Sequence, residues 1–442
     1  MAAPQAPRRQ LLEAYFEKYP EAPREVVVKE SILRDGLAFT EAALKAGEGR
    51  HTKTYHLFTF DKVSPSDMKQ GEPLRVPECI RIYGGHYELR GRTNIRVRIN
   101  PDSPYVVDVQ GGKLRLCDSQ GLVAEVADYP PRPKYYAKSF EDGTPYSQVV
   151  QLSYPGLGYP RVIAFMPCQY WGPKEECKYC DINENIRLRK ERGALSISES
   201  YQRVDRVATV TREIILGEDW EEGARPKALM ISGGSIFRKF MGKTEEQFYL
   251  PYVEAARYCC EKEWPLTADL QTTPPDKALA RRMYDAGVRV HRGNFEVWDK
   301  SLFETICPGK ARSVGRETWM HNLVESVDTF GVGNVYPGFV AGVEMAQPWG
   351  FKTVDEAIAS NREGFEFLMS HGVIPRVINW LPEPHSALGA QEPPSLDYAI
   401  RIDLLWYEIW KKHSLPHPPG YERPMGPGRA MNPNGAFLDV GD

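Results

Sequence analysis

The feature that most constrains the fold is a regular alternation of short apolar runs and helix-like segments after residue 160. The apolar runs lie at 161–166, 228–234, 266–273, 288–298, 335–343 and 373–381. The segments with helical spacing of apolar residues lie at 198–217, 244–262, 276–286, 316–330, 354–371 and 395–412. Apolar strands that alternate with helices are typical of a parallel sheet covered by helices. Six such units predict an α/β fold with a partial (βα)6 TIM-like barrel, in which chemistry is expected at the C-terminal ends of the strands.

The part of the chain before this alternation has a different pattern. Residues 8–48 carry apolar residues at helical spacing, whereas residues 79–129 hold short alternating runs between turn signals. We therefore expect an N-terminal α+β accessory domain, made of helices and then a small antiparallel sheet. The expected divisions are an accessory domain at 1–130, a linker at 131–154, the barrel at 155–390, and a C-terminal helix with a Pro/Gly-rich extension at 391–442.

Charge and hydropathy exclude several classes of partner. A formal net charge of −3, spread over both signs, gives no general attraction to nucleic acid or to an anionic membrane. No stretch approaches the ~18 consecutive apolar residues needed to cross a bilayer. The first twenty residues lack the apolar core of a secretory signal. We therefore expect a cytoplasmic protein that acts on a small molecule.

Three cysteines are crowded into the stretch "CQYWGPKEECKYC", directly after the first predicted barrel strand. Cys168, Cys177 and Cys180 have the spacing C-x8-C-x2-C. With only eight cysteines in the whole chain, such a cluster favours metal binding or catalysis over a disulfide framework. Three thiolates can hold three irons of a [4Fe–4S] cluster and leave the fourth iron open for catalysis. The alternative is a zinc site with a distant histidine or Cys307 as fourth ligand, although zinc ribbons usually pair two C-x2-C knuckles and only one exists here.

Several short motifs follow the predicted strands in a fixed order. They are "CKYC" at 177–180, "SGGS" at 232–235, "GNFEVW" at 293–298 and "GFVAGVE" at 338–344. With these motifs, residues 160 to 385 resemble radical SAM enzymes, whose common cysteine spacing is C-x3-C-x2-C with an aromatic residue before the last cysteine. The first gap departs from that pattern, because it holds eight residues instead of three. The form "CxYWG…CxxC" also resembles a little-characterised branch of this family found beside nitrilase-type gene clusters.

The resemblance implies a set of cofactor contacts. Cys168, Cys177 and Cys180 would hold the cluster, and Tyr179 would contact the adenine of S-adenosylmethionine (SAM). Gly233 and Gly234 would recognise its ammonium group, with Ser235 in place of the family's glutamate. The further expected contacts are Asn294 and Glu296 to ribose and amino acid, and Gly342 to adenine. Arg312 is a candidate for a carboxylate, either of SAM or of an acidic substrate, because a guanidinium can donate two hydrogen bonds at once.

The resemblance also implies an activity. A reduced cluster would cleave SAM to methionine and a 5′-deoxyadenosyl radical, which would abstract hydrogen from a small substrate. Lys310 and Arg312 hint that this substrate is anionic. We expect an external electron donor of the flavodoxin or ferredoxin type, a single cluster and no cobalamin. The alternatives are a zinc-dependent or zinc-stabilised barrel hydrolase that uses the three cysteines as metal ligands and, third, a binding module without catalysis.

Overall fold

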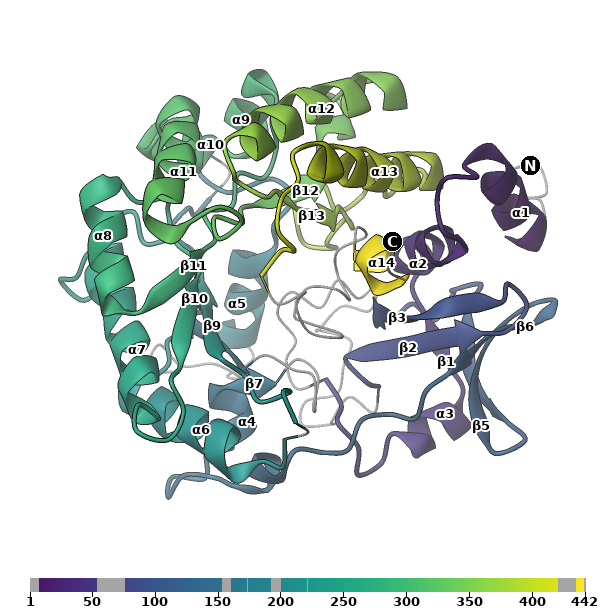
Figure 1. Ribbon diagram of the computed structural model, residues 1–442, viewed down its shortest axis with the longest axis horizontal. Helices are drawn as coiled ribbons and strands as arrows, with labels where there is room; N and C mark the ends of the chain where they lie inside the picture. The colour runs from purple at the N-terminus through teal and green to yellow at the C-terminus, as the bar shows by residue number, and fades with distance from the viewer. Residues whose placement is uncertain are drawn as a thin grey trace.

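The computed structural model describes residues 8–53, 76–152, 160–172, 174–191, 200–220, 222–419 and 435–440. Two hydrophobic cores divide these residues, one in the N-terminal part and one in the barrel. Figure 1 shows the N-terminal sheet on one side of the molecule and the barrel on the other. Among the described residues, no helix has the length and apolar character needed to cross a membrane.

The N-terminal part combines short helices with one sheet. Its helices are α1 (Arg8–Lys18), α2 (Arg24–Asp35) and α3 (Glu41–Ala46). Its strands are β1 (Ala38–Phe39), β2 (Cys79–Gly84), β3 (Leu89–Arg96), β4 (Val106–Gln110), β5 (Lys113–Asp118) and β6 (Gly121–Val126). The strand order is β1-β4-β5-β6-β2-β3, and every pair is antiparallel except β1 with β4. The structure thus contains the helices and the largely antiparallel sheet that the sequence predicts.

The segment between the two parts is not a bare linker. It holds a 3-10 helix, η1 (Lys134–Ala137), the single helical turn α4 (Tyr146–Val149), and the short strand β7 (Gln151–Leu152). Strand β7 pairs antiparallel with the first barrel strand. The domain boundaries predicted at 130, 154 and 390 stay predictions.

Six parallel strands form the barrel in sequence order. They are β8 (Pro160–Phe165), β9 (Ala228–Gly233), β10 (Thr267–Leu270), β11 (Val288–His291), β12 (Gly338–Ala341) and β13 (Arg376–Asn379). The first four pair in succession, β12 pairs with β13, and isolated parallel bridges at His291 and Glu296 connect the two groups. No pairing joins β13 back to β8 in the part of the chain that the structure describes. The predicted partial barrel is therefore confirmed, with all six strands within or next to their predicted runs.

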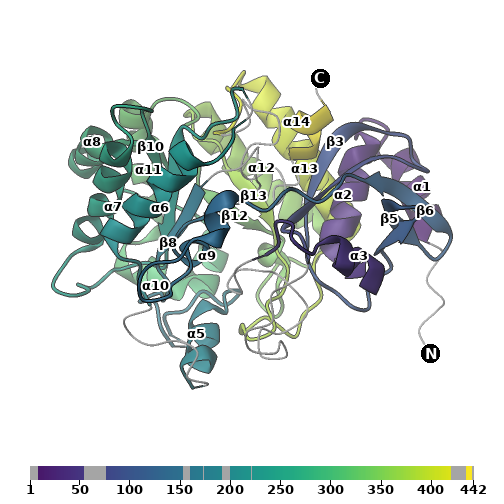
Figure 2. The ribbon, with the colours of Figure 1, turned by 90° about the horizontal axis from the view of Figure 1, so that it is seen from below.

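Helices cover the outside of the barrel (Figures 1 and 2). They are α5 (Ile182–Glu191), α6 (Val204–Gly217), α7 (Glu245–Cys259), α8 (Lys277–Ala286), α9 (Lys300–Ile306), α10 (Pro308–Ser313), α11 (Arg316–Phe330), the 3-10 helix η3 (Val343–Met345) and α12 (Val354–Ser370). Many of these helices begin at a polar cap; Thr244 and Thr353, for example, form capping boxes that satisfy otherwise unpaired backbone N–H groups. Each predicted helix is present, and α5, α9 and α10 are additional.

Helix α13 (Leu396–Lys412) joins the two parts of the molecule. Its first turns bury Leu396 and Ile400 in the N-terminal core, whereas Trp406 and Ile409 belong to the barrel core. The last helix, α14 (Gly435–Val440), lies beside α2 (Figures 1 and 2), and Phe437 packs with Val26 there. Most of the predicted Pro/Gly-rich extension, residues 420–434, lies outside the described residues.

The fourth predicted strand needs a correction. Its run extends to residue 298, but β11 ends at His291. Glu296 has a backbone φ of +74°, which no extended strand contains, and Val297 donates a backbone hydrogen bond to Phe295. Asn294 and Glu296 therefore lie in a turn after β11 and not in the strand expected over 288–298.

Candidate functional site

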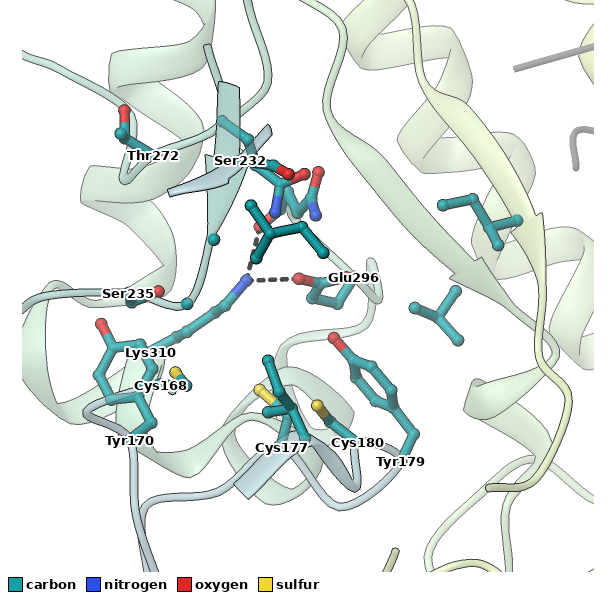
Figure 3. Close-up of a pocket in the computed structure, with 18 of the residues that line it drawn as sticks. Cys168, Tyr170, Cys177, Tyr179, Cys180, Ser232, Ser235, Thr272, Glu296 and Lys310 are labelled. Atoms are coloured by element: carbon teal, nitrogen blue, oxygen red, sulfur yellow. Dashed lines mark hydrogen bonds and ion pairs between the residues drawn. The ribbon is translucent and has the colours of Figure 1, made fainter. Parts of the chain in front are cut away.

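A cavity of about 270 Å³ opens inside the barrel, toward the C-terminal ends of its strands. Each strand or the loop that follows it contributes to its lining, for example through Ile163, Ser232, Gln271, Glu296, Val340 and Ile378. Figure 3 shows the three cysteine sulfurs at one side of this cavity, with Lys310 and Glu296 facing them. The end of a barrel at which chemistry is expected therefore carries the cysteine loop.

Backbone hydrogen bonds fix the cysteine loop in place. The Cys168 N–H donates to Oδ1 of Asn183 at 3.0 Å, and the Asn183 amide in turn donates to the Tyr170 carbonyl at 2.9 Å. A tight turn joins the other two cysteines, since the Cys180 N–H donates to the Cys177 carbonyl. All three thiols line the cavity and none is in a disulfide.

Burial affects the three thiols differently. It raises the pKa of Cys168 to about 11 and that of Cys180 well above the ordinary cysteine value. A hydrogen bond with the buried Cys307 lowers the pKa of Cys177. Metal coordination deprotonates a thiol outright, so these three sulfurs are suited to be ligands despite their burial.

The long first gap of the cysteine motif packs against α10. The ring of Tyr170 stacks on Phe237, and its hydroxyl lies 2.8 Å from the Ser313 hydroxyl. A Cβ atom at Gly309 would lie 2.5 Å from the Tyr170 ring, so only glycine permits this contact. The buried aromatic of the loop is therefore Tyr170, while the neighbouring Trp171 is exposed.

A buried ion pair stands opposite the cysteines. Nζ of Lys310 lies 2.5 Å from Oε1 of Glu296 and donates to the Asn294 carbonyl at 2.9 Å (Figure 3). Burial on its own would lower the pKa of Lys310, but the charges of Glu296, Cys177 and Cys307 together with the hydrogen bond to Glu296 outweigh it, and the pKa rises. Glu296 keeps its left-handed backbone, a conformation that non-glycine residues adopt at a cost of roughly 1–3 kcal/mol and that clusters at functional sites.

The "SGGS" motif lies directly against the cysteine loop. A Cβ atom at Gly234 would lie 2.0 Å from the Pro167 carbonyl oxygen, and the Ser235 carbonyl accepts the Gln169 N–H. Gly233, Gly234 and Ser235 all line the cavity. The backbone of the cysteine loop approaches Gly234 so closely that a side chain would not fit, and this explains the glycine independently of any bound ligand.

The structure brings most of the predicted site residues together. The three cysteines and Tyr179, Gly233, Gly234, Ser235, Asn294 and Glu296 line one cavity. Gly342 does not line it, because the residue faces Pro394, and the exposed Arg312 pairs with Glu175 at 3.0 Å. The segment around Lys310 forms α10, and Lys310 is 7% exposed.

Sequence reasoning missed several cavity residues. Arg161, Arg376 and Trp380 all lie inside predicted apolar runs, and Trp380 directly follows the observed strand β13. Their signal is the interruption of an apolar strand by a charged residue, which is costly to bury without a partner. Among the described residues, which include the three cysteines, no group of three or more His, Cys, Asp or Glu side chains is arranged to hold a metal ion.

Comparison with known proteins adds one sequence match. No family model matches the chain. A bacteriochlorophyllide c C-7(1)-hydroxylase from Chlorobaculum limnaeum is 27% identical over 170 residues, which cover 36% of this chain and 39% of that relative. The chain resembles radical SAM enzymes. That prediction is confirmed, whereas the assignment to the branch beside nitrilase-type clusters stays a prediction.

Three solved structures are similar to this chain at low sequence identity. Methylornithine synthase is 14% identical, with a TM-score of 0.37 over 62% of this chain and 72% of that one. A radical SAM methyltransferase from Sphaerobacter thermophilus is 14% identical, with a TM-score of 0.37 over 74% and 82%. Coproporphyrinogen III oxidase from Escherichia coli, described as a radical SAM enzyme, is 10% identical, with a TM-score of 0.30 over 48% and 46%.

Proposed function

We propose that this protein is a radical SAM enzyme that holds a [4Fe–4S] cluster through Cys168, Cys177 and Cys180. The observation that carries the proposal is the convergence of three free thiols on one cavity at the C-terminal mouth of a six-stranded barrel. Thiolates are the ligands that iron–sulfur clusters take, and three of them leave one iron open. The donor set thus fits a cluster with a site for an exogenous ligand.

When bound, the cluster and SAM supply the chemistry: an electron cleaves SAM to methionine and a 5′-deoxyadenosyl radical, which takes a hydrogen atom from the substrate. The protein itself would bind and orient the cluster, SAM and the substrate, and would exclude water from them. The Tyr179 ring beside Cys180 offers a face for adenine (Figure 3). Gly233, Gly234 and Ser235 present backbone groups to the cavity, where a ligand can approach closely. We assign the electron delivery to a flavodoxin- or ferredoxin-type donor.

The buried pair keeps the site electrically balanced. Lys310 and Glu296 are each less than a tenth exposed and neutralise one another across 2.5 Å. Lys310 also fixes the Asn294 carbonyl, and Asn294 accepts the Gly338 N–H at 2.9 Å. The turn after β11 is therefore held rigidly over the cavity, which suits a reaction in which positional errors of about 1 Å can cost ~100-fold in rate.

The substrate of the bacteriochlorophyllide hydroxylase cannot be assigned to this chain from the sequence match. That protein is named for hydroxylating a bacteriochlorophyllide, but the match covers 36% of this chain. A cavity of about 270 Å³ lies just below the usual range of roughly 300–1,000 Å³ for small-molecule sites. We therefore propose a small substrate rather than a tetrapyrrole.

Anaerobic reconstitution of the full chain with iron and sulfide tests this function. The expected result is a brown protein with about four irons per chain that forms 5′-deoxyadenosine from SAM and reductant. Cys177→Ser and Cys180→Ser should lose both properties. Cys259→Ser, at a thiol outside the cavity, should keep them. A colourless protein that carries one zinc, or one that depends on Cys307, would support the zinc alternative instead.

A further inference from the structure

Two buried donors, one on β13 and one directly after it, have no acceptor among the described residues. They are Nε of Arg376 and the indole Nε1 of Trp380. Among the described residues, no hydrogen bond or ion pair reaches the Arg376 side chain. Roughly 90% or more of buried polar groups in proteins are hydrogen-bonded, so two exceptions on one wall of a cavity call for an explanation.

The strand places both donors in the same cavity. Arg376 and Ile378 share one side of β13, because side chains alternate along a strand, and both line the cavity. Trp380, directly after the strand, lines it too. Arg376 is the first residue of β13, and Arg161 is the second residue of β8. Both arginines therefore lie near the N-terminal ends of their strands, whereas the cysteines come after the C-terminal end of β8. Arg376 therefore lies at the deep end of the cavity, opposite the proposed cluster.

The carboxylates near Arg376 are already committed to other cations. Asp269 forms a two-pronged ion pair with Arg292, with Nε to Oδ1 at 2.6 Å. Glu296 is paired with Lys310. Burial and the nearby Arg292 lower the pKa of Arg376 to about 10, which leaves the guanidinium charged at neutral pH. The deep end of the cavity thus carries a guanidinium with which no described carboxylate forms a direct ion pair.

We propose that Arg376 binds an acidic group of the substrate, a carboxylate or a phosphate, at the floor of the barrel. Identifying this ligand as the substrate rests on the proposed function, whereas the anion site itself does not. A planar guanidinium can grip either group through two parallel hydrogen bonds. The substrate would then extend along β13 toward the Trp380 N–H, roughly 13 Å of strand away at ~3.3 Å per residue. Its reactive carbon would lie between this anchor and the cysteines.

Binding of simple anions to the full chain tests this site. Acetate, succinate and inorganic phosphate are titrated into both the reconstituted and the iron-free protein, with tryptophan fluorescence as the readout, because Trp380 and Trp319 line the cavity. Acetamide, which is neutral, serves as the matched probe. We expect saturable binding of at least one anion and none of acetamide. Comparison of carboxylates with phosphate identifies the preferred group.

Variants assign the binding to Arg376. Arg376→Gln should weaken anion binding at least 10-fold, Arg376→Lys should weaken it less, and the exposed control Arg282→Gln should leave it unchanged. Equal anion affinities in the wild type, Arg376→Lys and Arg376→Gln would overturn the proposal. The absence of saturable anion binding in the wild type would overturn it as well. If Arg376→Gln fails to fold, the Arg376→Lys titration decides. A protein that binds anions through Arg376 but forms no 5′-deoxyadenosine would refute the proposed function and leave the anion site standing.

Discussion

Two buried glutamates in this molecule are stabilised in opposite ways. Glu296, in the cavity, faces the ammonium of Lys310 at 2.5 Å. Glu30, on α2 at the seam between the N-terminal part and the barrel, lies close to the buried Asp403 of α13. Burial raises the pKa of Glu30 to about 8 and that of Asp403 well above its usual range. The cavity glutamate is paired with a cation, whereas the seam favours protonation of its two acids.

Asn379 connects Glu30 at the seam with the cavity. The Asn379 amide donates to Oε2 of Glu30, and Asn379 also lines the cavity. Within the described residues, Oε1 of Glu30 and both carboxylate oxygens of Asp403 have no hydrogen-bond partner. Lys29 lies near enough to lower both pKa values but does not offset burial. The comparison shows that a buried acid is tolerated either by pairing or by neutralisation, and each solution predicts a different response to mutation and pH.

The largest expected effect follows from breaking the pair in the cavity. Lys310→Met would leave Glu296 buried without its cation, which typically costs about 3–5 kcal/mol of unfolding free energy. Urea denaturation of the full chain at pH 7 measures it. The double variant Lys310→Met/Glu296→Gln should lose clearly less than the sum of the single variants. Simple additivity would show that the two side chains do not stabilise one another.

A pH series tests the seam. The protonated form of Glu30 is favoured in the folded protein, so its stabilising contribution is complete below the unfolded pKa of about 4.3 and is lost as pH rises toward about 8. Over that window the wild type should lose up to about 1.4 kcal/mol of unfolding free energy per pH unit from this group. Glu30→Gln should flatten the slope measured by urea denaturation at pH 5.5, 6.5 and 7.5. The exposed Glu254→Gln should keep the wild-type slope, and an unchanged slope in Glu30→Gln would contradict the assignment.

A third test compares the packing around two glycines, Gly234 beside the cysteine loop and Gly217 at the end of α6. On the cavity side, Gly234→Ala would press a methyl group into the Pro167 carbonyl, 2.0 Å away, and move the backbone beside Cys168. Overpacking of this kind costs typically about 1–3 kcal/mol. Gly217→Ala is a matched control, because its methyl would meet only the movable end of the Glu213 side chain. Thermal unfolding should separate the two variants; equal melting temperatures would mean that the loop yields without cost.

How far the sequence could predict this site depends on the kind of information needed. The six strands follow from local apolar runs, and the cysteine loop follows from its position after β8. Glu296 lines the cavity at a turn, and its backbone φ of +74° does not follow from the apolar run in which it lies. The role of Arg376 was not predictable from the sequence. It depends on the pairing of the nearby carboxylates Asp269 and Glu296 with other cations, Arg292 and Lys310, and these contacts form only in the folded chain.

The smallest effect comes from an ion pair with good geometry but no burial. Arg362 on α12 donates two hydrogen bonds to Glu408 on α13, at 2.9 and 3.0 Å, yet the two side chains are 46% and 58% exposed. Exposed pairs contribute about 0–1 kcal/mol and are screened by salt. Arg362→Gln should therefore lower the unfolding free energy by less than about 1 kcal/mol, and 1 M salt should remove most of the difference. A loss comparable to that of Lys310→Met would mean that pairing itself, rather than burial of the partner left behind, determines the cost.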